Sequence, residues 1–338
     1  GAATDWVMRS YFGRINLSWA DKYLFEGNIR RDGSSRFHKD HRWGTFPSFS
    51  LGWRMSEENF MNSIKWLDML KLRLSWGALD NYEYQSVYNK DNYVLGNSVV
   101  PGLAQIQLAN ALVSWETTYV TNIGLDFSLF GSKLDGTIEL FNKDTHDILI
   151  DLPAPLLVGN ASIPTQNAAR VRNRGMEMNL KWNHRIGKVN YFVGGNFTFI
   201  DNEVTRFKGE ERSISGTNMI QEGYPINIQY VLAVDRILQT DEDMLFVEKM
   251  IKDAPVDPAT GQRVNPFASY GTPKKGDFLY KDLNGDNIID DNDQCPIGNP
   301  IYPQLTAGIT AGFEYKGFDF SMLWAGSGKV SRFISAGL

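Results

Sequence analysis

The stretch WETTYVTNIGLDFSLF, residues 115–130, decides the fold because apolar and polar side chains alternate along it. Ile123 and Phe127 belong to the apolar set, and Asn122 and Asp126 belong to the polar set between them. Successive side chains of an extended strand point to opposite faces, so a period of two gives each set its own face. The stretch therefore predicts a long β-strand with one apolar and one polar face.

The same period of two recurs along most of the chain. In MEMNLKWN, residues 176–183, Met176 and Leu180 oppose Glu177 and Lys181. We predict an all-β chain of about ten strands, several of them longer than the usual ~5–6 residues. Their approximate spans are 9–20, 23–31, 45–55, 70–77, 115–130, 134–146, 170–184, 189–200, 301–314 and 318–326.

One segment, 56–69, lacks the alternation. Ser56 is a good N-cap residue, and Glu57 and Glu58 follow it where acidic side chains favour the first turn of a helix. We therefore predict a short helix over 56–69 that is capped by Ser56.

The predicted connections alternate between short and long. The short ones are 21–22, 131–133, 185–188 and 315–317, and the long ones are 32–44, 78–114, 147–169 and 201–300. A transmembrane β-barrel sorts its connections in this way, with tight periplasmic turns and long extracellular loops. We predict that residues 1–338 form part of an antiparallel transmembrane β-barrel, with 201–300 as a long extracellular loop. A large soluble β-domain, secreted and binding carbohydrate or calcium, is the alternative.

Composition excludes several classes of protein. The net charge of −5 argues against a nucleic-acid-binding protein, which usually carries a basic stripe. The single cysteine, Cys295, excludes internal disulfides and multi-cysteine metal sites. The four histidines are scattered and neither HExxH nor GxSxG occurs, so we do not predict an enzyme.

The stretch KDLNGDNIIDDND, residues 281–293, is dense in oxygen-bearing side chains. Its pattern matches positions 1, 3, 5, 9 and 12 of a calcium-binding loop. The matching residues are Asp282, Asn284, Asp286, Asp290 and Asp293. Position 6, usually Gly, is Asn287, which tolerates the left-handed backbone needed there. No amphipathic helix is predicted on either side of the stretch, so it is not an EF-hand. It is either a loop that bound calcium holds rigid or a solvated acidic turn. We predict no required cofactor, and calcium as an optional one.

Two further sets of side chains are candidates for binding. Tyrosines cluster in the 78–114 connection, where they suit either stacking on a sugar substrate or contact with a protein lid. These are Tyr82, Tyr84, Tyr88 and Tyr93. Charged residues on the polar faces of the strands suit either a substrate path or contacts with a plug. These are Arg14, Arg73, Glu116, Asp126, Glu139, Glu177 and Lys181.

A third candidate is RRDGSSRF, residues 30–37. Its Asp32-Gly33 pair predicts a tight turn at the end of a strand. Its arginines either contact another part of the assembly or are simply solvated.

Several segments in order resemble one family. YFGRINLSWADKYLFEGNIRRDGSSRF, WGTFPSFSLGWRMSEENFM, WLDMLKLRLSWG, TTYVTNIGLDFSLF, NAARVRNRGMEM and GDFLYKDLNGDNIIDDND are similar to segments of the SusC/RagA family of TonB-linked outer-membrane proteins from Bacteroidetes. Arg174 stands where that family usually has Lys, and Asn287 stands where it usually has Gly.

The resemblance implies a TonB-dependent receptor that imports nutrients through the bacterial outer membrane. Substrates of the family are typically oligosaccharides released in polysaccharide utilisation, and in some members peptides. The resemblance implies a large barrel with a plug, a SusD-like surface lipoprotein as a lid, and energy from TonB with ExbB and ExbD. The chain is similar to roughly the C-terminal third of a member, and its ten predicted strands are too few to close such a barrel.

Overall fold

The computed structural model describes residues 6–81, 92–95, 98–101, 112–150, 166–208, 212–332 and 334. The chain divides into two compact units. The first contains most of residues 1–212 together with 221–226 and 303–329, and the second contains 213–220, 227–302 and 330–338. Each unit is described by itself.

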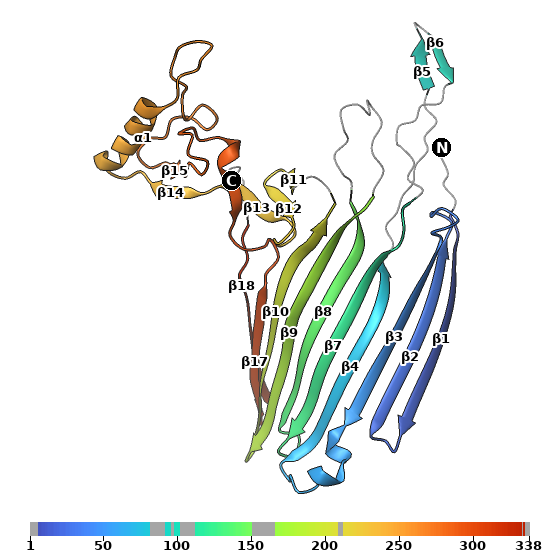
Figure 1. Ribbon diagram of the computed structural model, residues 1–338. Coiled ribbons are helices and arrows are strands. Elements are labelled where there is room, and N and C mark those ends of the chain that lie inside the picture. The colour runs from blue at the N-terminus through green and yellow to red at the C-terminus, as the bar shows by residue number, and fades with distance from the viewer. Residues whose placement is uncertain are drawn as a thin grey trace. The chain divides into compact units, whose positions relative to one another are not determined.

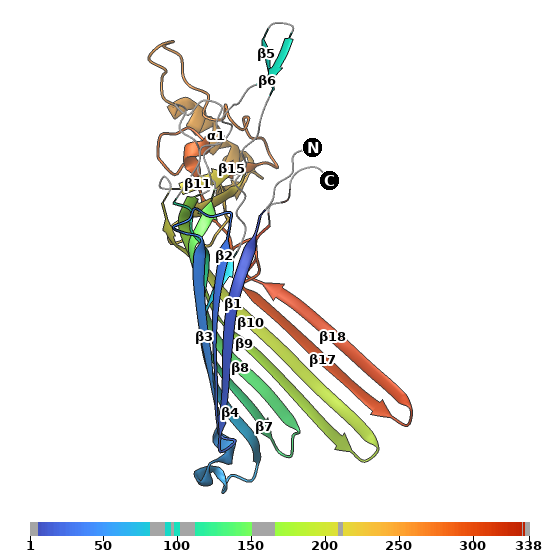
Figure 2. The same ribbon diagram turned by 90° about the vertical axis from the view of Figure 1, so that its right-hand side faces the viewer.

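The first unit is one ten-stranded antiparallel sheet in the order β1-β2-β3-β4-β7-β8-β9-β10-β17-β18 (Figures 1 and 2). The strands are Met8–Trp19 (β1), Tyr23–Ser34 (β2), Trp43–Arg54 (β3), Leu67–Asn81 (β4), Glu116–Leu129 (β7), Leu134–Ile150 (β8), Gln166–Ile186 (β9), Val189–Phe207 (β10), Leu305–Tyr315 (β17) and Phe318–Gly328 (β18). Among the described strands β1 and β18 do not pair with each other, so the sheet is open, as a part of a barrel would be.

The strand register places apolar residues opposite apolar residues on neighbouring strands, as the alternation predicts. Leu72 on β4 pairs with Trp53 on β3 and with Leu125 on β7. Its neighbour Arg73 pairs with Gly52 and with Gly124. Side chains that are directly opposite in an antiparallel pair share a face, so the apolar side chains of these strands share one face and the charged side chains share the other.

The short connections are tight turns at one end of the sheet, here called the turn end. Ala20 and Asp21 have φ values of 51° and 54°, and Lys316 and Gly317 have 48° and 86°. Two residues separate the paired Tyr315 and Phe318, and three separate the paired Trp19 and Tyr23. Two consecutive left-handed residues match the twist of the flanking strands in such short hairpins. The longer connections leave the opposite end, here called the loop end, except for residues 55–66, which join β3 to β4 at the turn end. The predicted sorting of connections is therefore present with that one exception.

The predicted helix over 56–69 is wrong. Two 3-10 turns, Met55–Glu57 and Asn59–Met61, replace it, and Arg54 rather than Ser56 occupies the first cap position. Glu58 lies between the turns with an extended backbone. Its carboxylate accepts bonds from the Tyr23 hydroxyl at 2.7 Å and from Trp53 Nε1 at 3.2 Å, and such a tether to the sheet keeps this residue out of a helix.

The predicted turn at Asp32-Gly33 is also wrong. Strand β2 continues through both residues to Ser34, and Gly33 pairs with Arg9 and Trp43. The backbone pairing of three strands continues past the point where the sequence suggests a turn.

The second unit is built from short elements. Arg212–Ser215 (β11), Asn218–Gln221 (β12), Ile228–Leu232 (β13) and Gln294–Ile297 (β16) form a four-stranded sheet, and Val234–Ile237 (β14) pairs with Phe278–Tyr280 (β15). Its core gathers buried side chains from along the segment, namely Leu232, Leu238, Val247, Phe267, Leu279 and Ile289. The helix Asp241–Asp253 (α1) is capped at Thr240 and contributes Val247 to this core.

A small hairpin lies outside both larger sheets. Asn92–Leu95 (β5) and Ser98–Pro101 (β6) form a hairpin within the connection from β4 to β7. None of the helices in the described ranges has the length and apolar character to cross a membrane.

Candidate functional site

The apolar face of the sheet exposes large side chains. On β1, Ile15 and Leu17 are 62% and 60% exposed, and on β3 Leu51 is 44% exposed. Burial of apolar surface is worth about 25 cal/mol per Å², so a continuous exposed sheet face of this kind indicates contact with an apolar medium or partner.

Aromatic rings border this face at the turn end. The Trp19 and Tyr23 ring centroids are 5.6 Å apart, and those of Tyr23 and Trp53 are 6.5 Å apart. Further along, Trp66 stacks on Phe130 at 6.0 Å. Amphipathic aromatic rings of this kind favour the boundary between hydrocarbon and water.

A second set of aromatic rings borders the face at the loop end. Tyr11 stacks on Trp43 at 5.9 Å, and Trp76 stacks on Tyr119 at 6.2 Å. Ten positions along β3 separate Trp43 from Trp53. At about 3.4 Å per residue and a tilt of about 40°, they span roughly 26 Å of membrane, close to the ~25 Å band of outer-membrane barrels.

The polar face carries a three-residue ion cluster. Arg73 Nε and Nη2 donate to the two carboxylate oxygens of Asp126 at 2.7 and 3.0 Å, and Nη1 donates to Glu139 at 3.0 Å. A Cβ at Gly124 would lie 2.8 Å from the guanidinium, so glycine there leaves room for it. The cluster has one cation and two anions, and it lies beside a concavity lined in part by Asn16, Glu26, Ser50, Lys71, Ser75 and Asn122.

Other charged residues predicted for the polar face lie on its strands. Arg14 Nε donates to Asn28 at 2.8 Å, and Glu116 accepts a bond from the Leu149 N–H at 3.4 Å. Glu177 and Lys181 lie on β9 at positions paired with Glu139 and Asp135. The structure joins Arg73, Asp126 and Glu139 directly and places the others separately.

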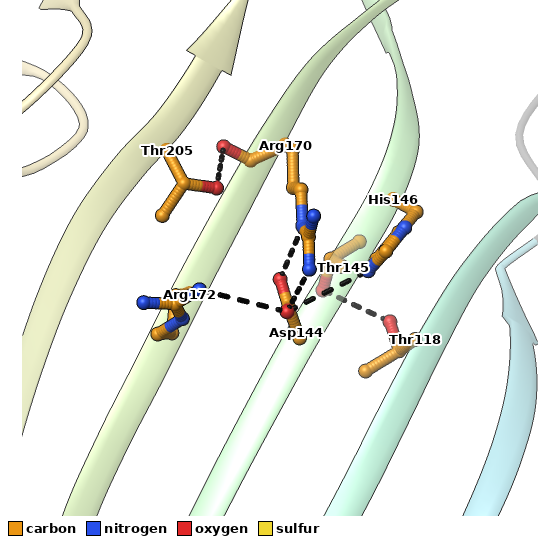
Figure 3. Close-up of polar contacts among 7 residues, drawn as sticks. All are labelled: Thr118, Asp144, Thr145, His146, Arg170, Arg172 and Thr205. Atoms are coloured by element: carbon orange, nitrogen blue, oxygen red, sulfur yellow. Dashed lines mark hydrogen bonds and ion pairs between the residues drawn. The ribbon is translucent and has the colours of Figure 1, made fainter.

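A second ion cluster at the loop end was missed by the sequence reasoning (Figure 3). Arg170 Nε donates to Asp144 Oδ1 at 2.8 Å, and its Nη2 donates to Oδ2. His146 Nε2 lies 3.6 Å from the same Oδ2, and Arg172 lies 4.0 Å from it. The signal in the sequence was the alternation of Arg170, Arg172 and Arg174, which continues the alternation of β9 beyond its apolar part.

The acidic stretch in the second unit bonds to its own backbone. Asp282 accepts N–H bonds from Gly285 at 2.7 Å and Asn287 at 2.8 Å. The fully buried Asp293 accepts from Leu283 at 2.7 Å and Asp290 at 3.0 Å. These bonds tie the acidic side chains to the backbone of their own loop, and the carboxylate oxygens keep further lone pairs.

The geometry bears on the calcium prediction. Asn287 has φ 61°, so it adopts the left-handed backbone expected at its position. Within the described ranges, however, no group of three or more His, Cys, Asp and Glu side chains is arranged so that it could hold a metal ion. The oxygen chemistry suits calcium and the present arrangement does not converge on an ion, so calcium binding stays a prediction.

Comparison with known proteins identifies the sheet. A family model described as "TonB dependent receptor-like, beta-barrel" matches residues 2–234. The chain belongs to this family. It is 34% identical to TonB-dependent receptor P39 of Formosa agariphila over 95% of this chain and 33% of the relative. It is 32% identical to TonB-dependent receptor SusC of Bacteroides thetaiotaomicron over 94% of this chain and 31% of the relative.

A solved structure shows the same fold. The structure of the RagAB peptide importer in the "closed-closed" state superposes with a TM-score of 0.73 at 22% identity, covering 96% of this chain and 33% of that chain. The chain therefore spans about a third of the length of the relatives it matches. The predicted resemblance to SusC/RagA proteins and the predicted barrel fold are confirmed.

Membership in the TonB-dependent receptor family assigns the two faces. Its members are outer-membrane transporters and not enzymes, so the apolar face of this chain contacts lipid and the polar face lines the lumen. The alternative of a soluble secreted domain does not fit this family.

The structure does not describe the side chains of the tyrosines predicted to bind substrate. Tyr82, Tyr84 and Tyr88 lie outside the described residues. Tyr93 lies in β5, whose backbone alone is described. Their role stays a prediction.

Proposed function

We propose that this chain is part of the wall of a TonB-dependent transporter that imports oligosaccharides or peptides across the outer membrane. The observation that carries the proposal is the two-faced sheet, which is apolar toward lipid and carries the Arg73, Asp126 and Glu139 cluster toward the lumen. A lumen wall of charged and hydroxyl side chains suits solutes rich in hydroxyl or amide groups.

The proposal includes partners that act with regions outside this chain. A SusD-like surface lipoprotein would cap the loop end and capture substrate, and TonB with ExbB and ExbD would supply energy. One similar solved structure is that of a peptide importer, and other relatives are TonB-dependent receptors whose names state no substrate. The proposal therefore includes both oligosaccharides and peptides.

The proposal also sets an orientation, with the loop end and the 201–300 segment outside the cell. Single cysteines in the full-length protein test it with a membrane-impermeant maleimide. Ala259→Cys lies in an exposed turn of the second unit, and Lys188→Cys lies at the turn end. Intact cells should label position 259 and should label position 188 only after permeabilisation; the reverse result would invert the orientation.

Purification and uptake together test the function. The full-length protein is extracted from outer membranes in mild detergent, and co-purifying proteins are identified by mass spectrometry. Cells are then given labelled oligosaccharides or labelled peptides, with a strain that lacks TonB as the control. We expect a stoichiometric lipoprotein and TonB-dependent uptake of one class; uptake of neither class, with a barrel that is folded, would contradict the proposal.

A further inference from the structure

We propose that Arg9, Arg31, Tyr11 and Trp43, here called the rim patch, bind the phosphate groups of an outer-leaflet lipid. The four residues lie at the loop end of β1, β2 and β3. The inference rests on the orientation proposed above, and it is independent of which substrate the transporter imports.

The strand register brings the four residues together on the lipid-facing side. Tyr11 is directly opposite Arg31, and Arg9 and Trp43 are both opposite Gly33. The four therefore share a face with Ile15 and Leu17, which are exposed to lipid.

The aromatic rings hold Arg31 in place. The Trp43 ring stacks on Tyr11 with centroids 5.9 Å apart, and the Arg31 guanidinium carbon lies 5.4 Å from the Trp43 ring centroid. A Cβ at Gly33 would come within 2.7 Å of the Trp43 ring, so glycine lets that ring lie over β2. A guanidinium over an indole ring is ordered by the cation–π contact and keeps N–H donors for another partner.

The two arginines lack a counter-charge in the described part of the chain. No ion pair there involves Arg9 or Arg31. Asp32 is adjacent in sequence but lies on the opposite face, where Arg30 binds it at 2.6 Å. Arg9 and Arg31 are diagonal neighbours, with Cα atoms about 7–8 Å apart, so they repel each other until an anion lies between them.

Two arginines elsewhere on the lipid-facing side have a close carboxylate partner. Arg170 is bound to Asp144, and Arg174 is bound to Asp201 at 3.0 Å. No such partner is described for Arg9 or Arg31, and the register makes these two cations neighbours on adjacent strands.

The position of the patch specifies the partner. Trp43 marks the loop-end edge of the apolar band, so Arg9 and Arg31 lie at the depth of the lipid headgroups. Phosphate is the anion that a lipid offers at that depth, and arginine binds it with two parallel N–H donors. Tyr11 adds a hydroxyl beside them. An outer-leaflet lipid that carries phosphate therefore complements the patch in charge, depth and geometry.

The test compares lipid that remains bound to the full-length transporter. Wild type and the Arg9→Gln/Arg31→Gln variant are extracted from native outer membranes in mild detergent, and bound lipid is quantified by native mass spectrometry. Loss of two charge-assisted contacts should lower the retention of phosphorylated outer-leaflet lipid by about tenfold or more. Arg174→Gln/Arg185→Gln makes the same change in charge elsewhere on β9 and should retain lipid as wild type does.

Rebinding identifies the chemical group. Delipidated wild type is titrated with the phosphorylated outer-leaflet glycolipid, with its enzymatically dephosphorylated form, with a glycerophospholipid and with inorganic phosphate. We expect a thermal shift with the first probe alone. Equal retention by wild type and the Arg9/Arg31 variant, or equal binding of the dephosphorylated lipid, glycerophospholipid or free phosphate, would overturn the proposal.

Two controls keep the test decisive. Heat-modifiable mobility in gels shows that each variant is folded, and the single variants Arg9→Lys and Arg31→Lys serve if the double variant does not assemble. Lysine keeps the charge without the planar fork, so these variants should fall between wild type and the glutamine variant. Substrate uptake by the Arg9/Arg31 variant should continue, which separates failure of this inference from failure of the transporter proposal.

Discussion

Arg170 binds both carboxylate oxygens of Asp144 across the pair β8 and β9, with Nε donating to Oδ1 at 2.8 Å and Nη2 donating to Oδ2 (Figure 3). The Asp144 side chain is 12% exposed and that of Arg170 is 36% exposed. The pair thus joins two long strands at the loop end, beyond the apolar part of the sheet.

Removing Arg170 should weaken this end of the sheet. Arg170→Ala leaves Asp144 with only His146 at 3.6 Å and Arg172 at 4.0 Å. We expect a loss of about 1–2 kcal/mol, less than the ~3–5 kcal/mol of a fully buried pair because the arginine is partly solvated. The measurement is the temperature at which the full-length barrel loses heat-modifiable mobility.

The matched control uses the exposed pair on the same strand. Arg174 and Asp201 have side chains 60% and 37% exposed, so Arg174→Ala should cost about 0–1 kcal/mol. If both variants lower the transition equally, the Asp144 pair has no special role.

Substitution by alanine should destabilise the sheet at one of its glycines and leave it unchanged at another. A Cβ at Gly175 would overlap the Phe199 carbonyl oxygen and lie 2.7 Å from the Phe141 ring, whereas a Cβ at Gly326 meets nothing within 4 Å. Gly175→Ala should cost about 1–3 kcal/mol or more, and Gly326→Ala should be neutral. The check is the folded fraction of each full-length variant in outer membranes, and equal fractions would refute the reported close approach.

The apolar alternation predicted where strands lie but not where they end. The stretch 115–130 predicted β7 closely, because Glu116–Leu129 crosses the membrane with one face in lipid. The strand predicted over 189–200 is too short, since β10 continues to Phe207. Asp201 and Glu203 lie beyond the apolar band, where backbone pairing extends the strand without an apolar face.

The sequence predicted which face of the sheet carries the charged residues, but it did not predict which of them contact each other. Arg73, Asp126 and Glu139 were expected to line the lumen, yet their contact depends on a register between strands far apart in sequence. Alternation fixes that register only to within two residues. Helix α1 was not predicted although Thr240 and Asp243 form a capping box, because a period of two indicates strands and gives no signal for a helix.

That capping box makes the start of α1 sensitive to acid. Backbone N–H groups of Thr240 and Gln239, and then the Thr240 hydroxyl, hold the pKa of the Asp243 carboxyl below its ordinary value. Because folding lowers the pKa of Asp243, its carboxylate stabilises the helix at pH values above the pKa of the unfolded state, about 3.9. That stabilisation is lost as the pH falls through the pKa of the folded state.

Hydrogen exchange of the full-length protein checks this dependence. Amides in the first turn of α1, corrected for intrinsic rates, should be protected at pH 6 and should lose protection below about pH 3.9. Asp243→Asn has no carboxyl to titrate at that site and should show a smaller change. An identical pH response in the variant would assign the effect to other groups.

The buried carboxylate of Asp293 should hold the acidic loop together. It accepts the N–H groups of Leu283 and Asp290, so Asp293→Ala leaves two part-buried donors without their acceptor. We expect a cost of about 1–3 kcal/mol, seen as faster exchange across 282–293. Asp291→Ala removes an exposed carboxylate from the same turn, together with the bonds it accepts from the Tyr270 hydroxyl at 2.6 Å and from Gln294 at 3.0 Å, and should cost less, about 0.5–1 kcal/mol.

The same exchange experiment decides whether that loop needs calcium. The N–H groups of Gly285 and Asn287 already bind Asp282, and that of Ile288 binds Asp286 at 2.8 Å, so these amides have acceptors without a metal. Chelation of calcium from the full-length protein should therefore leave exchange across 282–293 unchanged. If added calcium instead slows exchange there, and Asp282→Asn abolishes the slowing, the loop is a calcium site.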